Sequence, residues 1–353
     1  MEGDIVRIAG TVGTGKTTLF QYLMKNVEKD INVVIICGGR SNEISQLVQD
    51  SELKENSVFF VVPSYETAAS RILCVYSGIT AAEYYRDMGY KINVFIDDIS
   101  RWYEALDTSG NIDPIPASKF SGPSHEYFTR IFNQLYSRAG KIAVENLSGS
   151  HSLLPGVITL FVVQSFVGTC LFDLSRQERV SILLDAKLSK ARKYPAINIS
   201  TSFSYNSRIH NCEKLLKAIS RTTSILQHGQ DLQEIVELVG VDSLEDKDSF
   251  LLYVVRLVKE NFMQQPLQPS EWLPLLNLFL NILDCGEDLL RFPSFTVHTI
   301  INNFRETISM IEDLKWADVN GSAWQEQISC IQNSITKTTV RLQEIGAEYN
   351  QIQ

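Results

Sequence analysis

The sequence lacks several features that mark whole classes of protein. Its 353 residues carry 32 Lys and Arg against 41 Asp and Glu, a net charge of −9, with no dense basic cluster. A nucleic-acid-binding protein needs a basic footprint to displace counterions from phosphates, so this balance disfavours that class. Apolar residues make up 44% and charged residues 21%, which excludes an intrinsically disordered chain. The length allows two or three domains.

Cysteines are few and scattered. No CxxC pair and no Cys/His cluster with zinc spacing occurs among Cys37, Cys74, Cys170, Cys212, Cys285 and Cys330. We therefore expect buried thiols in a reducing compartment. The histidines are isolated too, at His125, His151, His210, His228 and His298. No metal other than Mg²⁺ is expected.

A signal peptide is missing from the start of the sequence, where residues 1–10 contain two acids and no apolar core. One uncharged run, Leu153–Leu171, is long enough to cross a bilayer. However, it contains Pro155 and Gly156 and is rich in β-branched residues, which predicts two buried strands with a connector. We expect a cytoplasmic protein.

The first 200 residues alternate short apolar segments with helical patterns. Strands are predicted at Ile5–Ala9, Asn32–Cys37, Val58–Pro63, Ile92–Ile96 and Val157–Gln164. Helices are predicted at Thr17–Asn26, Asn42–Gln49, Tyr65–Met88 and Phe128–Arg138. This alternation predicts an α/β domain with a parallel sheet covered on both faces.

After about residue 205 the pattern becomes helical. Apolar residues recur with a 3.6-residue period in Leu215–Gln227, Leu232–Val239, Ser249–Met263, Trp272–Asp284 and Val297–Lys315. We expect a nucleotide-binding domain over residues 1–208, a helical bundle over 209–315 and a C-terminal helix over 316–353. That last helix has a 4-3-4-3 seam that either packs on its own domain or docks a partner: Trp324, Ile328, Ile331, Ile335, Thr338, Leu342, Ile345 and Tyr349.

Residues 10–17 read GTVGTGKT and satisfy the phosphate-loop pattern GxxxxGK[ST] between a predicted strand and a predicted helix. In such a loop, backbone N–H groups and the helix dipole bind phosphate. The alternative is a glycine-rich turn with a stray lysine. The motif predicts that ATP or ADP contacts Gly10, Gly13, Thr14, Gly15, Lys16, Thr17 and Thr18. Lys16 is expected on the β- and γ-phosphates and the Thr17 hydroxyl on Mg²⁺.

An acidic pair follows the apolar strand INVFI. P-loop ATPases hold the magnesium shell with an acid at the end of a neighbouring strand, so Asp97 is the predicted Mg²⁺ residue and Asp98 the second choice. Paired acids after a strand also serve as helix caps.

Several segments resemble the catalytic A subunit of vacuolar/archaeal-type rotary ATPases. VYSGITAAEYYRDMGYKINVFIDDISRWYEAL (75–106) is similar to that family's IYTGITLAEYFRDMGY, its Ala-Asp-Ser strand end and its SRWAEAL. CGGRSNEI (37–44), KYPAIN (193–198) and DLQEIVELVG (231–240) resemble its CGERGNEM, HFPSVN and DLNEIVQLVG. The resemblance implies a RecA-like P-loop NTPase domain followed by an all-α domain.

It also implies partners and site residues. In the family, three A and three B subunits alternate in a ring around a central stalk, and ATP hydrolysis drives proton or sodium transport. B-type and central stalk subunits would be the partners, with no nucleic acid, and the chain would lie peripherally on a membrane through a membrane sector. Arg40 matches the arginine beside the γ-phosphate and Glu43 the second glutamate of that loop, which makes them candidate catalytic residues with Lys16.

One departure concerns catalysis. The family's Cys-Gly-Glu-Arg has its water-polarising glutamate where this chain has Gly39. Activation of a nucleophile by such a group contributes on the order of 10²–10⁴ in rate. A second hypothesis is therefore a degenerate paralogue that binds nucleotide as a structural or regulatory element. A third, a RecA-like nucleic-acid motor, is disfavoured by the charge.

Other departures concern assembly. QSFVGTCLFDLSR (164–176) replaces the family's SPPGGDFSDPV, and the similarity starts at the strand before the phosphate loop, without the N-terminal β-barrel. Tyr194 and Phe203 are candidates for stacking on a base or for the core. Arg101 is expected to bond helix carbonyls, and Arg208 is a weak candidate for an arginine finger.

Overall fold

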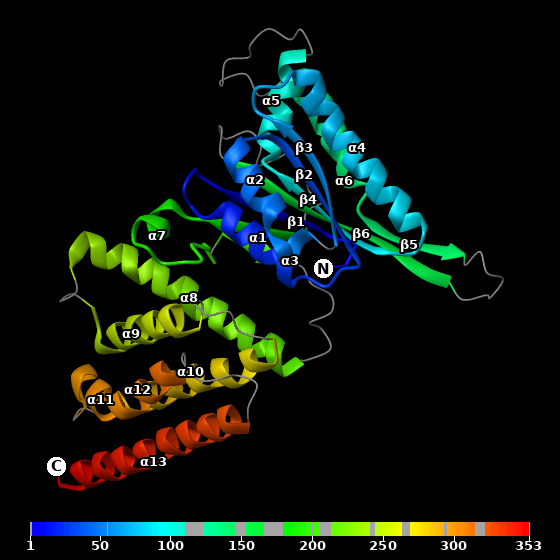
Figure 1. Ribbon diagram of the computed structural model, residues 1–353. Helices are drawn as coiled ribbons and strands as arrows, with labels where there is room; N and C mark the ends of the chain where they lie inside the picture. Colours follow the sequence, from blue (N-terminus) through cyan, green and yellow to red (C-terminus); the bar gives the residue numbers. More distant parts are fainter. Residues whose placement is uncertain are drawn as a thin grey trace. The chain divides into compact units, whose positions relative to one another are not determined.

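The computed structural model describes residues 2–54, 56–109, 123–145, 153–165, 179–199, 201–204, 213–240, 244–262, 269–292, 295–314 and 322–352. The chain divides into two compact units, Met1–Asn206 and Ser207–Gln353. Within the described residues, all strands belong to the first unit, and the second unit is helical (Figure 1).

One mostly parallel sheet forms the first unit, with strand order β3-β2-β4-β6-β1-β7-β8 and β5 paired to β6. Only β5 and β8 run antiparallel to their neighbours within the described part of this sheet. The predicted parallel sheet of an α/β nucleotide-binding domain is therefore confirmed. The strands are β1 (Ile5–Gly10), β2 (Ile31–Gly39), β3 (Ser57–Pro63), β4 (Lys91–Asp97), β5 (Gly140–Glu145), β6 (Leu153–Ser165), β7 (Val180–Leu184) and β8 (Phe203–Ser204).

Helices cover both faces of this sheet (Figure 1). They are α1 (Lys16–Asn26), α2 (Ser41–Gln49), α3 (Ser51–Lys54), α4 (Ala68–Asp87), α5 (Ile99–Ser109), α6 (Pro123–Tyr136) and α7 (Ala186–Lys190). Alternate residues of β2 enter opposite cores: Ile35 packs with Trp102 of α5, and Ile36 packs with Phe20 of α1. Because both faces are buried, the central strands read as continuous apolar runs.

The uncharged run beginning at Leu153 forms one long strand as far as it is described. β6 pairs with β5 at its start and with β4 and β1 along the rest. The predicted strand Val157–Gln164 is confirmed within the longer β6. Residues 166–171 lie outside the described part, so the second strand expected in this run stays a prediction. No helix among the described residues is long and apolar enough to cross a membrane.

Some element limits differ from prediction for identifiable reasons. The helix expected from Tyr65 begins at Ala68, because the Thr67 hydroxyl caps it by accepting the Ser70 N–H at 3.3 Å. The predicted elements omit β5, β7, α5 and α7. Of these, α7 has only five residues, which is too few to complete a helical pattern.

The second unit consists of α8 (Glu213–Val239), α9 (Asp246–Asn261), α10 (Pro269–Leu289), α11 (Val297–Asn303), α12 (Arg305–Asp313) and α13 (Ser322–Ile352). Two predictions are wrong here. The patterns at 215–227 and 232–239 form the single helix α8, in which a Cβ on Gly229 would lie 2.7 Å from Val255 Cγ2 of α9. The pattern at 297–315 forms two helices separated by the buried Phe304.

The seam of α13 is buried along most of its described length. Trp324, Ile328, Ile331, Ile335 and Leu342 are buried, whereas Ile345 is 38% exposed. α13 packs on α10 and α12 of the same unit, with the hydroxyls of Thr307 and Ser334 3.1 Å apart. This part of the seam therefore belongs to the core of the second unit, and the side chain of Tyr349 lies outside the description.

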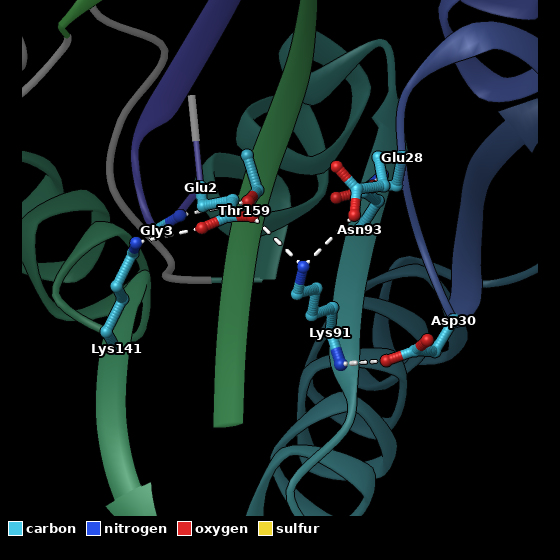
Figure 2. Close-up of polar contacts among 8 residues, drawn as sticks. All are labelled: Glu2, Gly3, Glu28, Asp30, Lys91, Asn93, Lys141 and Thr159. Carbon is cyan, nitrogen blue, oxygen red and sulfur yellow. Dashed lines mark hydrogen bonds and ion pairs between the residues drawn. The ribbon is translucent and has the colours of Figure 1, made fainter. Parts of the chain in front are cut away.

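Ion pairs and hydrogen bonds connect the residues at the edge of the sheet where the parallel strands begin (Figure 2). Lys91 at the start of β4 pairs with Glu2 at 3.3 Å and Glu28 at 3.1 Å, and its backbone N–H donates to the Asp30 carboxylate at 2.7 Å. Glu2 also pairs with Lys141 of β5 at 2.9 Å. The network ties the entries of β1, β2 and β4 to β5, away from the site described next.

Candidate nucleotide-binding site

The phosphate-loop motif begins at the edge of the sheet where the parallel strands end. Gly10, the last residue of β1, lies in register with Ser165 of β6 and Leu184 of β7. β4 ends beside them at Asp97. In open α/β sheets, ligands bind outside the carboxyl ends of the strands. The phosphate-loop motif starts at this edge of the sheet.

Two glycines give the loop its shape. Gly13 has φ +83° and Gly15 has φ +88°, in the left-handed region that favours glycine. The Thr14 hydroxyl donates to the Thr11 carbonyl at 2.8 Å and closes the turn. Gly15 is the N-cap of α1, so the first N–H groups of the helix start at the loop, where they can bind an anion.

Lys16 folds back over this loop. Its Nζ donates to the carbonyls of Gly10 at 2.9 Å and Thr11 at 2.7 Å. Burial lowers the pKa of Lys16, and the nearby Asp98 and Asp97 oppose that change. Phosphate oxygens are stronger hydrogen-bond acceptors than the two carbonyls. The Lys16 ammonium group is therefore expected to exchange its carbonyl partners for an entering phosphate.

Two carboxylates face this lysine. Burial, followed by the charge of Asp98, raises the pKa of Asp97 to about 6. Asp98 has φ +49°, accepts the Ser165 hydroxyl at 3.0 Å and lies 3.4 Å from Arg101 Nε. Its Oδ1 is buried and has no hydrogen-bond partner in the described part of the chain.

These oxygens suit a divalent cation. Asp97 is a partly buried carboxylate next to the buried Asp98 oxygen that has no partner. A divalent cation with its water shell would stabilise the negative charge of this pair. Thr17 and Thr18 are exposed at the start of α1, directly after Lys16. The residues present therefore fit Mg²⁺.

Arg40 and Glu43 do not join this cluster. Their side chains are 79% and 56% exposed and form an ion pair of 3.8 Å at the start of α2. Neither is hydrogen-bonded to the phosphate loop within the described residues. The Glu43 charge nevertheless contributes to the raised pKa of Asp97, so α2 borders the site.

Position 39 is closed by apolar packing. A Cβ on Gly39 would lie 2.7 Å from Ile36 Cγ2 and 3.1 Å from Ile44 Cδ1. A contact below 3.0 Å requires a neighbour to move, and Ile36 is buried in the core of the sheet. Position 39, at the end of β2, therefore lacks a carboxylate, and the side chains of Ile36 and Ile44 fill the space that a carboxylate side chain would need.

Comparison with known proteins settles the family. Residues 1–204 match the ATP synthase alpha/beta family, nucleotide-binding domain, and residues 211–271 match the C-terminal domain of V and A type ATP synthase. The chain belongs to the ATP synthase alpha/beta family. It contains an ATP synthase-like nucleotide-binding domain, and the resemblance to the A chains of V/A-type ATP synthases is confirmed.

Relatives in this family are identical to the chain at about a third of the aligned positions. The V-type ATP synthase alpha chain 2 of Clostridium tetani is 36% identical over 287 residues, 75% of this chain and 47% of that protein. The A-type ATP synthase A subunit of Methanosphaera stadtmanae is 33% identical, over 75% and 48%. The chain spans about half the length of the curated relatives it matches.

Two solved structures show the same fold. The ATP synthase subunit NeqB from Nanoarcheaum equitans has a TM-score of 0.66 at 20% identity, covering 80% of this chain and 74% of that one. The ATPase EscN of the enteropathogenic E. coli type III secretion system has a TM-score of 0.64 at 21% identity, covering 79% and 67%. The predicted architecture of a P-loop domain followed by a helical domain is confirmed.

In this ATP synthase family member, residues next to the site hydrogen-bond to the ends of β2 and β6. Arg101 donates to the Gly38 carbonyl, so its predicted bond is to a carbonyl at the end of β2 rather than in a helix. The Ser100 hydroxyl donates to the Ser165 carbonyl at 3.0 Å and accepts the Ser165 N–H at 3.2 Å. No sequence signal marks these two serines, because their pairing depends on β4 and β6 being neighbours.

The expectation of buried thiols is correct only in part. Burial raises the pKa of Cys37 to about 12 and that of Cys74 to about 11, which makes both thiols unreactive. Cys285 is partly buried and Cys330 is exposed, so burial is wrong for the latter. Cys170 and Cys212, like Arg208, lie outside the described residues.

The aromatic candidates differ in position. Tyr194 is 51% exposed, and its ring carbons lie 3.8 Å from where a Cβ on Gly15 would be. Phe203 is 41% exposed in β8 at the edge of the sheet. Tyr194 therefore lies against the phosphate loop.

Among the described residues, no group of three or more His, Cys, Asp or Glu side chains could hold a metal ion.

Proposed function

We propose that this chain is an A-subunit-like component of a V/A-type rotary ATPase that binds Mg-ATP or Mg-ADP and hydrolyses ATP slowly. The observation that carries the proposal is a phosphate loop with its lysine in place, beside a position 39 that is filled by isoleucine side chains. Binding and catalysis use different groups, so the first can be retained without the second.

For binding, the chain supplies backbone N–H groups from Gly13 to Thr18, the Lys16 ammonium and the N-terminus of α1. Thr17 and Asp97 would hold Mg²⁺, with Asp98 behind them. A bound Mg²⁺ ion would supply positive charge that neutralises the phosphates.

For catalysis, a group must orient and deprotonate the attacking water. Gly39 has no such group. Glu43 is paired with Arg40 and mostly exposed, while Asp98 is paired with Arg101 and the Ser165 hydroxyl. Glu43 is engaged with Arg40, and the oxygen of Asp98 that has no partner is buried beside the proposed cation site. The missing glutamate at position 39 therefore supports the degenerate paralogue over the fully active motor.

Nucleotide binding is tested with the Lys16→Ala variant. Calorimetric titration of the full chain with Mg-ADP should show one site, and the variant should lose affinity by about a hundredfold, because it loses a charged hydrogen-bond donor to phosphate. Lys25→Ala, in the same helix but paired with Asp50 and Glu52, is the matched control and should bind normally. Equal affinity of the wild type and Lys16→Ala would contradict the proposed site.

The fully active motor is the second candidate, favoured by the names of the relatives, which are alpha chains and A subunits of V-type and A-type ATP synthases. In this proposal the chain joins B-type and central stalk subunits in a hetero-hexameric ring, peripheral to a membrane sector that carries protons or sodium. Native mass spectrometry of complexes from its own cells would test it: stalk and B-type subunits should accompany the chain, and a monomer would contradict it.

A further inference from the structure

A hydrogen-bond chain reaches the phosphate loop from outside the motif. The Ser189 hydroxyl, in α7, donates to the carbonyl of Gly13 at 2.9 Å. The hydroxyl of Tyr194 lies 3.1 Å from Ser189 Oγ and 3.4 Å from the Ser189 carbonyl. Both residues follow β7 and lie far along the chain from the loop that they contact.

The number of hydroxyl protons decides which group donates in each of these hydrogen bonds. A serine hydroxyl has one proton, and a carbonyl oxygen can only accept, so the Ser189 proton is used on Gly13. The reverse direction would leave two acceptors facing each other between Ser189 and Gly13. The Tyr194 hydroxyl therefore donates, and Ser189 Oγ at 3.1 Å is its nearer acceptor, with the Ser189 carbonyl at 3.4 Å. The order Tyr194 to Ser189 to Gly13 satisfies every group, and donors in series strengthen one another.

The segment that carries the two hydroxyls is itself anchored. The Asp185 carboxylate caps α7 by accepting the Lys187 N–H at 2.7 Å, and the Asp185 N–H donates to the Ala196 carbonyl at 2.8 Å. Leu184 and Ile197 form a bridge that closes the base of the segment. The two hydroxyls therefore approach the loop from a fixed support.

Holding the Gly13 carbonyl fixes the orientation of one peptide plane. In a planar trans peptide, the carbonyl of one residue and the N–H of the next point in opposite directions. With its carbonyl turned to Ser189, the Gly13–Thr14 peptide directs the Thr14 N–H to the opposite side. Gly13, at φ +83°, lacks the Cβ that would otherwise restrict this peptide, so a contact from Ser189 restricts its rotation.

We infer that Ser189 and the Tyr194 hydroxyl are positioning residues for phosphate, which hold the Thr14 N–H toward the bound anion. The inference rests on the proposed function, since it concerns the same nucleotide site. It assigns the tyrosine hydroxyl a task that is separate from any contact of the ring with a base.

The test compares a ligand with a base and one without. The full chain and the variants Tyr194→Phe, Ser189→Ala, Ser189→Thr and the double Ser189→Ala/Tyr194→Phe are titrated with ADP and with inorganic tripolyphosphate. Removing either hydroxyl should weaken both ligands by about two- to tenfold, the range for one hydrogen bond. The double variant should be no weaker than Ser189→Ala, because both hydroxyls act through Ser189. Ser189→Thr keeps the hydroxyl and should bind normally.

Tyr84→Phe, on the exposed face of α4, is the matched control for loss of a tyrosine hydroxyl. Unchanged tripolyphosphate affinity in Tyr194→Phe and Ser189→Ala would overturn the inference, and a loss confined to ADP would do so by assigning Tyr194 to the base alone. A Ser189→Thr variant as weak as Ser189→Ala would also overturn it, in favour of packing. A wild-type chain that binds neither ligand would contradict the proposed function as well.

Discussion

Single residues at the end of β4 and β2 determine what this site can do. Asp97 lies at the end of β4 beside the phosphate loop, where the sequence pattern predicts it. The structure adds that the pKa of this carboxyl is raised. The closure around Gly39 is beyond sequence reasoning, because it depends on which side chains of β2 and α2 meet in space.

The raised pKa of Asp97 gives a pH-dependent stability. Its folded pKa of about 6 lies above the ordinary 3.8, so the metal-free folded chain binds more protons than the unfolded chain between these values. The folded state therefore loses stability as the pH rises through about 6. We expect Asp97→Asn to raise the melting temperature in EDTA by a few degrees at pH 8, since about 1 kcal/mol corresponds to roughly 2–4 °C.

At pH 4.5 the same substitution should have a much smaller effect, because Asp97 is largely protonated there. Melting curves at the two pH values, read by circular dichroism, make the comparison. Equal shifts at both would contradict the assigned pKa.

Packing around Gly39 predicts a stability cost for any side chain. Gly39→Ala should lower the free energy of unfolding by about 1–3 kcal/mol, the usual cost of overpacking. Combining it with Ile36→Ala should cost less than the sum of the two single variants, because the second substitution removes the methyl group that the new Cβ meets. Urea denaturation of the four chains gives the coupling, and strict additivity would show that the contact is relieved in another way.

At the scale of elements, the long strands and helices follow their sequence patterns and the exceptions have local causes. α8 runs through Gly229, although a glycine between polar residues suggests a break, because the missing side chain lets α9 approach. The pairing of β5 with β6 and of β7 with β1 is decided by the whole sheet and not by a local pattern. The serines beside Asp98 depend on the same pairing.

The close approach of α8 and α9 can be tested at Gly229. Gly229→Ala improves intrinsic helix propensity by about 1 kcal/mol, yet its Cβ would lie 2.7 Å from Val255. We expect a net loss of stability of about 1–2 kcal/mol, and recovery in Gly229→Ala/Val255→Ala relative to Val255→Ala alone. A stabilising Gly229→Ala in thermal denaturation would mean that the helices separate without cost.

At the scale of the whole molecule, two units with different architectures combine a candidate nucleotide site with a helical domain, and each matches its own ATP synthase family model, the second over residues 211–271. The order of these parts and the phosphate loop are readable from the sequence, since each is a local pattern. The contacts of Ser189 and the filling of position 39 are not, since they depend on how segments meet in space. The central claim, binding without rapid turnover, rests on both kinds of feature.

The fate of bound ATP tests that claim most directly. The full chain, alone and in its purified complex, is loaded with Mg-ATP, separated from free nucleotide and quenched at intervals, and the bound nucleotide is identified. We predict that bound ATP has a half-life between about ten seconds and about ten minutes, because the turnover typical of enzymes, about 10 s⁻¹, falls by 10²–10⁴ without a group that activates the water. Conversion to ADP within about a second would contradict the account and show that another residue activates the water.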